Sequence, residues 1–581
     1  MREIVKDGFP EAGSIPTESV AASCKGPARW HNVTTWLLPS LGGILFSTVL
    51  LGVLLLGQSH ILGSSGDIAL HLRLGSDMLT KGGLVTTNTL TSVAYGQPAI
   101  AWEWLSELVF AGAWQLFGLN GVVAMTSLII AITSILLFQA VHRRSVPLLI
   151  AFPLTLAAIA LTSTQWLAGP HIFSLLLTLW WSEQLWSYWQ SDNPRKLWPF
   201  PFMLALWANL DGGYIAGVIL LTTATVLAWL FPNAASTRSI DARRWQLTLI
   251  LAVSLLATLL IPLGVGELPH LFSFFSSGVM LYYFSGSSPL DFRQPNGLLF
   301  LAMLLLLAAS GILRGWLMGG RAAHSANVDV QDEQRRLALL AAREPGALSW
   351  ALVGVFTAIA LISAAALPLW GVAVTPIMGR ELASWTAEWA VADMNGHLAC
   401  FCRALFRHSG KLEHIDKRLH AGLWSILAVV FMFVLLLDGG TLPGSASPLL
   451  STRFSPETFP VEAVQTIQHG VIPGNTLPNG TGFTTIAWAD YIEWTLPHHL
   501  VMIDSRTELF DDSVLGDYQT LLNGEPGWNQ IITTYNIRWL LIPTAVPLAQ
   551  IIVLAQSWLC QQVDTHHIAL LCLPAPALPV T

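Results

Sequence analysis

Charged residues are scarce in this chain. Only 11% of its 581 residues are Asp, Glu, Lys or Arg, and 53% are hydrophobic, whereas soluble domains carry about 25% charged residues. Most of the chain is therefore not a soluble globular protein. The five cysteines show no zinc or haem spacing, and nothing in the charge pattern supports nucleic-acid binding, so we expect no metal, no cofactor and no nucleic-acid partner.

Long apolar runs take the place of the missing charge. A transmembrane helix needs about 20 mainly apolar residues. Two candidate segments, 198–210 and 366–378, are short and contain proline, which predicts helices that end inside a cavity. We expect an α-helical multi-pass membrane protein with about eleven transmembrane helices, at 36–57, 120–141, 145–161, 171–189, 198–210, 213–231, 245–263, 297–313, 349–365, 366–378 and 421–438.

The basic residues predict how the chain is oriented. Residues 1–35 are polar and are too long a lead for a secretory signal, so the first span is expected to remain as an anchor with the amino terminus in the cytoplasm. With this topology, 22 of the 28 Lys and Arg residues fall in inner segments, as cytoplasmic loops favour. We expect a protein of the inner (plasma) membrane.

Three parts follow the cytoplasmic segment 1–35. They are a transmembrane body at 36–438, a large outer loop at 58–119 within it, and an extracytoplasmic domain at 439–581 after a Gly/Pro/Ser linker. In the last part, short apolar runs alternate with helical patterns, which predicts a small α/β domain. The inner loops 314–346 and 379–420 are expected to be helical and charged, without chemistry.

The cysteines of the carboxy-terminal part lie in "WLCQQVDTHHIALLCL", which has the pattern of a hairpin centred near His566. Cys560 and Cys572 are then cross-strand partners. A disulfide and two buried strand cysteines are both compatible with this pattern. Cys400 and Cys402 fall in an inner loop and are expected to be free thiols.

The outer loop holds the first candidate catalytic residues. If 66–78 is helical, Asp67 and His71 share a face and can act as a base and its orienting group. Ser64 and Asp67 also match a capping box, so a purely structural role for Asp67 remains open. A second helix is expected at 102–117, where Glu103 and Glu107 are either solvated surface acids or part of the site.

Further polar residues lie at the ends of predicted spans and strands. Asn209 and Asp211 precede two glycines in "LWANLDGGYIAG", which marks either a cavity or a tight turn. His171 begins a span, with a helix-end role favoured over a ligand role. In "VMIDSRTELF", Asp504 and Arg506 follow a predicted strand, where they either bind a ligand or order the loop as an internal ion pair.

Several short motifs together resemble bacterial multi-pass proteins related to the GT-C glycosyltransferases. The outer loop has Asp67, then His71 and Gly75, then "WEWL" at 102–105 and "GLNG" at 118–121. The likeness continues in "LWANLDGGYIAG", "SSPLDFRQP" and "WADYIEWTLPHHLVMIDSRTELF". The chain departs from its relatives at 209–212, where "NLHG" is usual, at Gly169–Pro170 in place of "RP", in "SAAALPLWG", where a basic residue is replaced, and at 489–491 in place of "GGY".

The resemblance implies transfer of a sugar from a polyprenyl-phosphate donor to a cell-envelope acceptor on the outer face, as in the mannosyl- and arabinosyltransferases of this class. Asp67 would be the catalytic base, and His71 and Glu103 would orient the acceptor, which is a glycan, lipid or protein. The residues expected to bind the substrates are Arg73, Asn209, Asp211, Arg293, Asp504 and Arg506.

Two other function classes remain open. A lipid phosphate needs positive charge or several donors, and the outer face of the body offers only Arg73, Lys81 and Arg293. This scarcity favours a second hypothesis, a catalytically degenerate relative that serves as an accessory or structural membrane subunit. A transporter of a lipid-linked solute ranks third, because it would carry more buried charge within its spans.

Overall fold

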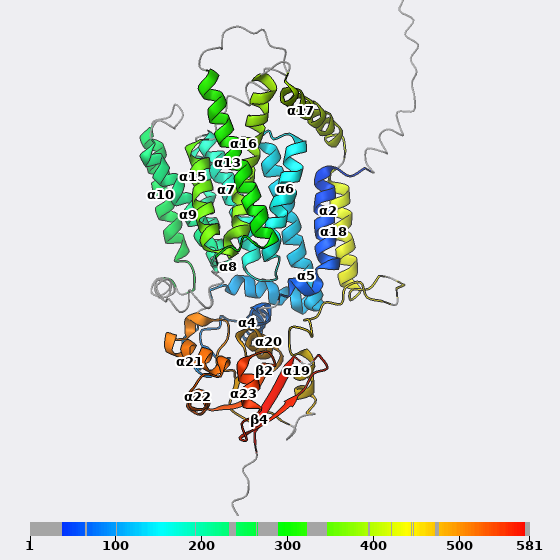
Figure 1. Cartoon of the computed structure of the whole chain (residues 1–581), viewed down its shortest axis with the longest axis vertical. Coiled ribbons are helices and arrows are strands. Elements are labelled where there is room, and N and C mark those ends of the chain that lie inside the picture. Colours follow the sequence, from blue (N-terminus) through cyan, green and yellow to red (C-terminus); the bar gives the residue numbers. More distant parts are fainter. Residues whose placement is uncertain are drawn as a thin grey trace, which may run out of the picture.

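The computed structural model describes residues 38–63, 67–99, 102–191, 193–231, 240–262, 264, 289–321, 346–392, 396–419, 421–442, 444–445, 447–470, 476–566 and 568–575. A bundle of roughly parallel helices forms one end of the molecule and a small α/β domain forms the other (Figure 1). Helix α4 (Asp67–Lys81) and the first part of α5 (Trp104–Arg143) lie between them. The molecule is thus mostly helical with a small carboxy-terminal sheet, as the sequence predicts.

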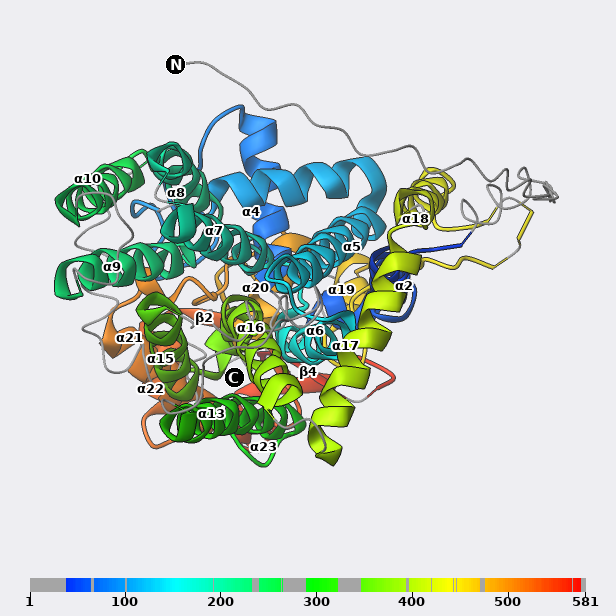
Figure 2. The ribbon, with the colours of Figure 1, turned by 90° about the horizontal axis from the view of Figure 1, so that it is seen from above.

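Each of the eleven apolar segments coincides with a helix. The helices are α2 (Leu41–Leu56), α5 (Trp104–Arg143), α6 (Leu148–Thr162), α7 (His171–Ser191), α8 (Pro199–Leu210), α9 (Tyr214–Leu230), α10 (Ile240–Thr258), α13 (Pro295–Arg321), α15 (Ala347–Ile362), α16 (Leu367–Ala392) and α18 (Ala421–Leu437). Seen from above, they surround α7 and α16 (Figure 2).

Not all of these helices are long enough to cross a bilayer on their own. Within the described residues, two helical stretches combine sufficient length and apolar character, Trp104–Arg143 and Leu148–Gln165, and five further apolar helices are shorter. The number of eleven spans therefore stays a prediction. The segment 366–378 is not a short helix that ends in a cavity, because α16 continues through Pro376 to Ala392.

Helix α5 changes direction where the sequence predicts the end of an interfacial helix. Phe117 and Gly118 have non-helical backbone angles, and Gly118 has a φ of 60°, which glycine adopts at little cost. The part before the break lies across the end of the bundle and the part after it runs along the bundle (Figure 1). One glycine thus separates the helix that borders the candidate site from the helix that crosses the body.

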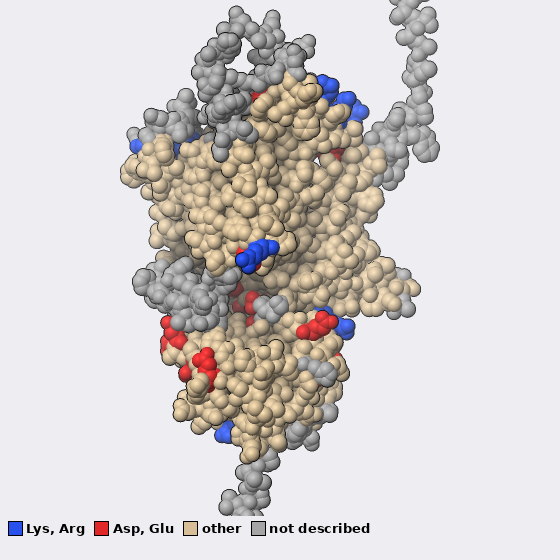
Figure 3. Space-filling model, viewed as in Figure 1, with Lys and Arg blue, Asp and Glu red and all other residues tan. Residues whose placement is uncertain are grey.

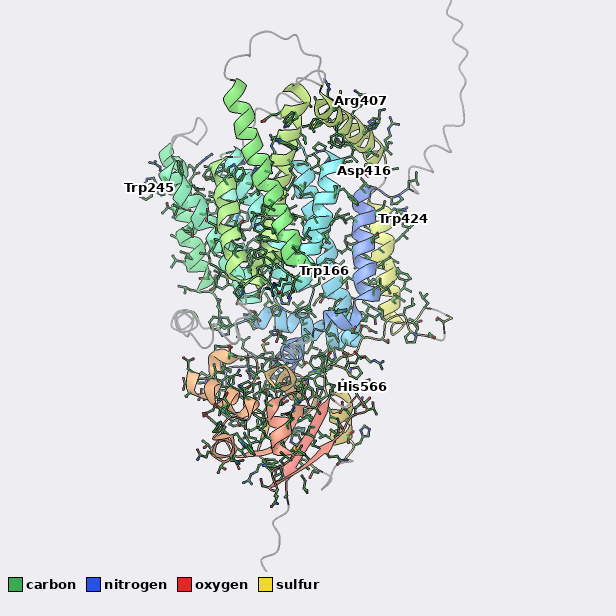
Figure 4. All side chains as sticks on the ribbon, viewed as in Figure 1. Trp166, Trp245, Arg407, Asp416, Trp424 and His566 are labelled. Atoms are coloured by element: carbon green, nitrogen blue, oxygen red, sulfur yellow. A yellow bond between two sulfur atoms is a disulfide. The ribbon has the colours of Figure 1, made fainter. Side chains whose placement is uncertain are left out.

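Exposed tryptophans gather at the opposite end of the body. Tryptophan favours the boundary between a bilayer and water. In Figure 4, Trp245 and Trp424 lie at a similar level on opposite sides of the bundle. The exposed tryptophans near the predicted inner helix ends are Trp198, Trp229, Trp245, Trp350 and Trp424. This belt supports a location in a membrane.

The carboxy-terminal domain has a four-stranded sheet in the order β1-β2-β4-β3. The strands are β1 (Thr481–Phe483), β2 (Ile537–Pro543), β3 (Trp558–Gln562) and β4 (Ala569–Pro574), and β1 and β2 are parallel. Helices α19 (Val461–Gln468), α20 (Ile486–Thr495), α21 (Asp512–Asn523), α22 (Trp528–Thr534) and α23 (Pro547–Ile552) complete the domain. The predicted strand near 499–504 is reduced to two isolated bridges at Val501, one to Thr91 and one to Gly482.

The predicted hairpin is formed, and Cys560 lies directly opposite Cys572. The two cysteines are joined by a disulfide, which decides between the two alternatives left open by the sequence. In the described residues Cys400 and Cys402 are free thiols, as expected. The disulfide holds the edge strand β3 to β4.

The outer loop joins this domain, which the sequence analysis does not foresee. Val501 bridges Gly482 of β1 on one side and Thr91 of the outer loop on the other. Ser92 N–H donates to the carbonyl of Val501 at 2.8 Å, and Ala94 is buried in the core of the domain. Residues of the outer loop and residues of the carboxy-terminal domain therefore pack together beside the helical body.

Candidate active site between the helical body and the C-terminal domain

Helix α4 (Asp67–Lys81) carries the first candidate residues. Its apolar residues, including Ile68 and Leu72, are buried in the main core, while Asp67 is exposed in the first turn. His71 follows one turn later on the same face, as predicted. Ser64 lies outside the described residues, so the capping box is not tested. An exposed carboxylate at a helix start, surrounded by buried neighbours, is available to a substrate.

His71 lies between two carboxylates of α5. Its Nε2 is 3.7 Å from Glu103 Oε2, and its Nδ1 is 3.5 Å from Glu107 Oε1. Glu107 is only 4% exposed. The interpretation as a solvated surface acid is therefore wrong for Glu107, whereas the side chain of Glu103 stays 26% exposed. The structure brings together His71 and Glu103, the two residues that the resemblance assigns to orienting the acceptor.

The turn after α8 completes this first group. Gly212 N–H is 3.5 Å from Glu103 Oε1, and Asp211 accepts hydrogen bonds from Ser174 and from the backbone of Gly213. Burial, together with the nearby carboxylates of Asp211 and Glu107, raises the pKa of Glu103 well above its usual range. Glu103 therefore holds a proton more readily than an exposed glutamate does.

Asn209 and Asp211 are used within the protein. Asn209 accepts a hydrogen bond from Trp104 Nε1 at 2.6 Å and donates to the carbonyl of Ala205. Trp207 donates to the same Ser174 hydroxyl that bonds Asp211. Both predicted binding residues are less than 9% exposed. Their observed contacts hold α5, α7 and α8 together beside the site.

The carboxy-terminal domain contributes a second group of carboxylates from α20 and the loop after Val501. Asp490, Glu493 and Asp504 are at most 1% exposed. Asp504 pairs with Arg506, which also donates to Asn88 of the outer loop at 2.9 Å. The predicted Asp504–Arg506 ion pair is thus present, and it orders the junction between the domain and the outer loop.

Asp490 and Glu493 carry strongly perturbed acidities. Burial, followed by the charges of Asp67 and Asp504, raises the pKa of Asp490 well above its usual range. Burial, followed by Asp504, does the same to the pKa of Glu493. From the sequence, Asp490 was predicted only as part of the departure at 489–491, and Glu493 was not predicted as a site residue. The two acids are three residues apart on α20, and this helical spacing could have indicated that they share a face.

Asp67 connects the two groups. Its carboxylate interacts electrostatically with Asp490 of the carboxy-terminal domain and with His171 at the start of α7. Figure 3 shows acidic side chains inside the crevice between the helical body and the carboxy-terminal domain. Three distant parts of the chain therefore meet around one exposed carboxylate.

The predicted cations are not gathered at this point. Arg73 pairs with Asp77 at 3.3 Å and lies 3.5 Å from the carbonyl of Glu493. Arg293 is exposed on the loop before α13, and in the described structure it has no hydrogen bond or ion pair to another predicted site residue. Among the described residues no group of three or more His, Cys, Asp or Glu side chains is arranged to hold a metal ion.

No protein-family model and no curated protein sequence matches this chain. Among solved structures, the oligosaccharyltransferase of Archaeoglobus fulgidus in its apo form is similar, with a TM-score of 0.45 and 11% sequence identity. The similarity covers 89% of this chain and 70% of that chain. A TM-score of this size does not establish a common fold, so the function must be inferred from the site and the sequence motifs.

Proposed function

We propose that this protein is a GT-C-like membrane glycosyltransferase that moves a sugar from a polyprenyl-phosphate donor to a hydroxyl of a cell-envelope acceptor. The observation that carries the proposal is the position of Asp67. It is an exposed carboxylate that interacts with Asp490 of the carboxy-terminal domain and with His171 at the start of α7 in the helical body. A donor with a lipid tail and a polar sugar needs an apolar and a polar environment at one place.

The reaction requires one base. Asp67 accepts the proton of the acceptor hydroxyl while that oxygen attacks the anomeric carbon of the sugar. The bond between the anomeric carbon and the phosphate oxygen breaks, and the polyprenyl phosphate leaves with the electron pair. Attack from the face opposite the phosphate inverts the configuration. General base catalysis of this kind contributes about 10²–10⁴-fold to a rate.

The neighbouring groups position the acceptor. Glu103 and Glu107 flank His71 at 3.7 and 3.5 Å, which limits the rotation of its ring. The raised pKa of Glu103 favours a protonated carboxyl that can donate a hydrogen bond to a sugar hydroxyl. We infer that His71 and Glu103 hold the acceptor beside Asp67, with Asn209 and Asp211 supporting them from the turn after α8.

One observation favours the accessory subunit as a second candidate. A donor phosphate is repelled by carboxylates unless cations are near. The arginines described at the junction already form ion pairs with acidic side chains of the protein. Arg506 pairs with the buried Asp504, and Arg73 pairs with Asp77. A relative that has lost donor binding would keep the fold and the interface but show no turnover.

A transporter is supported less well. The body buries Arg144, Glu381 and Glu388 at 4%, 1% and 4% exposure, but all three lie outside the predicted spans 120–141 and 366–378. These residues lie in the half of the body farther from the carboxy-terminal domain. Their position does not extend a polar path to Asp67, so transport remains the third hypothesis.

The test compares Asp67→Asn with Asp77→Asn, which removes a carboxylate from the same helix. Asp77 pairs with Arg73 and Lys81 at 3.3 and 3.7 Å and accepts no proton in the proposed step, although its loss also releases Arg73. Turnover of radiolabelled polyprenyl-phosphate sugars in nanodiscs is measured for both variants and the wild type. We expect a loss of about 10²–10⁴-fold for Asp67→Asn and a change within a few-fold for Asp77→Asn.

Each other result has a defined meaning. Full turnover by a folded Asp67→Asn protein would keep a transferase but remove Asp67 as its base. An equal loss in both variants would assign the effect to the stability of α4. A wild type that neither binds nor turns over any donor would reject the transferase and favour the accessory membrane subunit.

A further inference from the structure

Helix α17 (His397–Asp416) lies at the end of the body opposite the carboxy-terminal domain (Figure 1). It belongs to an inner loop in which the sequence analysis expects no chemistry. One face packs on the bundle. Cys402 is 1% exposed and joins Ala387 and Ala390 of α16, and the backbone N–H of Leu149 donates to the Ser409 hydroxyl at 3.4 Å.

The rest of α17 presents two different stripes. An apolar stripe is exposed, with Phe401 at 63%, Leu412 at 40% and Ile415 at 54%. A basic stripe includes the exposed Arg407 and Lys411. With 3.6 residues per turn, the centres of the two stripes are roughly a quarter of the helix circumference apart. This arrangement is typical of a helix that lies in a membrane interface, with its apolar side in the lipid and its basic side toward the phosphates.

An apolar groove of about 400 Å³ follows the second half of the apolar stripe. It contains one charged side chain, Asp416, whose carboxylate accepts a hydrogen bond from the backbone of Leu41 at 2.7 Å. That acid is therefore engaged by the protein. The groove is lined by Leu412, Ile415, Asp416 and Leu419 at one side and by Pro39, Leu41, Leu148, Leu149, Phe152 and Pro153 at the other.

Basic residues border the same half of the helix. Lys411, Lys417 and Arg418 are exposed, and Lys417 is paired with Glu413 at 2.6 Å. In Figure 4, Asp416 lies near the level of Trp245, whereas Arg407 lies farther from the centre of the body. The groove thus opens near the tryptophan belt, where lipid headgroups meet acyl chains.

We propose that α17 and the ends of α2 and α6 form a binding site for an anionic phospholipid of the leaflet opposite the carboxy-terminal domain. One acyl chain occupies the groove, and the headgroup phosphate is bound by Lys411, Lys417 and Arg418. A phospholipid fits better than a protein partner because an acyl chain needs an apolar channel beside positive charge. This site is independent of the proposed glycosyltransfer.

The test measures lipids retained by the purified protein. The full chain is placed in nanodiscs of phosphatidylcholine with an equal amount of phosphatidylglycerol, released, and analysed by native mass spectrometry. The variant Lys411→Gln/Lys417→Gln/Arg418→Gln removes the proposed headgroup contacts. The control Lys81→Gln/Arg453→Gln/Arg538→Gln makes the same change in net charge with residues of the outer loop and the carboxy-terminal domain.

We expect the wild type and the control to retain phosphatidylglycerol in preference to phosphatidylcholine. In the α17 variant, the ratio of retained phosphatidylglycerol to retained phosphatidylcholine should fall by at least about tenfold. The variant Leu149→Trp fills the groove without changing charge, and it should lose the retained lipid as well. Equal preference in all proteins, or no preference in the wild type, would overturn the proposal. A loss confined to the charge variants, with Leu149→Trp unaffected, would overturn the acyl-chain groove.

Discussion

Helices α4 and α17 are both amphipathic, and they lie at opposite ends of the molecule (Figure 1). Helix α4 is covered on several sides. Leu72 packs in the main core, Leu70 and Leu74 pack against Leu90 of the outer loop, and Arg73 reaches Glu493 of α20. Among the described residues, helix α17 is covered on one face. The same kind of sequence pattern therefore produces an enclosed helix at one end and an open one at the other.

The difference in covering determines what the charges of each helix can do. Around α4, burial and neighbouring acids raise the pKa values of Glu103 and Asp490, which is typical of sites that handle protons. Around α17, Lys411 and Arg418 are exposed at the surface. Buried acids suit chemistry, whereas exposed cations beside an apolar groove suit a membrane surface.

The largest expected effect comes from the same substitution in both helices. A Cβ atom on Gly75 of α4 would overlap the carbonyl oxygen of Glu107 and lie 2.7 Å from the Cβ of Ala111. Gly410 of α17 has open space around the same position. Gly75→Ala should cost about 1–3 kcal/mol through overpacking, whereas Gly410→Ala should stabilise by up to about 1 kcal/mol through helix propensity.

Thermal unfolding of both variants in the same detergent measures this contrast. Because membrane proteins often unfold irreversibly, apparent Tm values are compared at one scan rate. If Gly75→Ala and Gly410→Ala shift the apparent Tm equally, α4 is not enclosed as described. A large loss in Gly410→Ala would instead show that α17 has a covering partner.

A smaller effect on the free energy of unfolding is expected from a change in pH. The folded state keeps protons on Asp490 and Glu493 that the unfolded state releases near pH 4, because burial raises the pKa of both carboxyls. Burial also raises the pKa of Glu508 to about 7. The free energy of unfolding should therefore be highest in mild acid and should fall as the pH rises toward 7 and above.

Glu493→Gln mimics the protonated form and isolates this effect. The variant should unfold at a higher temperature than the wild type at neutral pH, and its apparent Tm should depend less on pH. Arg407→Gln on α17 is the control, since removal of an exposed charge changes stability by about 0.5 kcal/mol or less. A wild-type Tm that rises steadily from mild acid to neutral pH would contradict the assigned burial of these acids.

Much of the helical body could be predicted from the sequence, because apolar runs of this length have few alternatives to helices. The break in α5 was predictable as well, since Gly118 follows a complete interfacial pattern. The pairing of the predicted strand near Val501 was not predictable, because its hydrogen-bond partners come from residues 90–92 and from β1. Pairing between distant segments leaves no periodic signal in either one.

In the candidate site, too, local features were predictable from the sequence and contacts between distant segments were not. The helical spacing of Asp67 and His71 predicted their shared face. The Asp504–Arg506 ion pair, two residues apart, was one of two alternatives that the sequence left open. The contact of Glu103 with the turn at Gly212 and the influence of Asp67 on Asp490 depend on tertiary packing. Burial that arises from packing also explains why Glu107 was misjudged as a solvated acid.

The last prediction leaves stability unchanged and tests which end of the molecule faces the cytoplasm. Cys400 of α17 is exposed, Cys402 is buried, and Cys560 and Cys572 are joined. In a Cys24→Ser variant, Cys400 is then the reactive thiol of the native protein, since burial raises the pKa of Cys402 and lowers its reactivity. A membrane-impermeant maleimide should label Cys400 in inverted vesicles and leave it unlabelled in intact cells. Labelling in intact cells would place Asp67 in the cytoplasm, away from a donor on the outer face, and would contradict the proposed transferase topology at its first step.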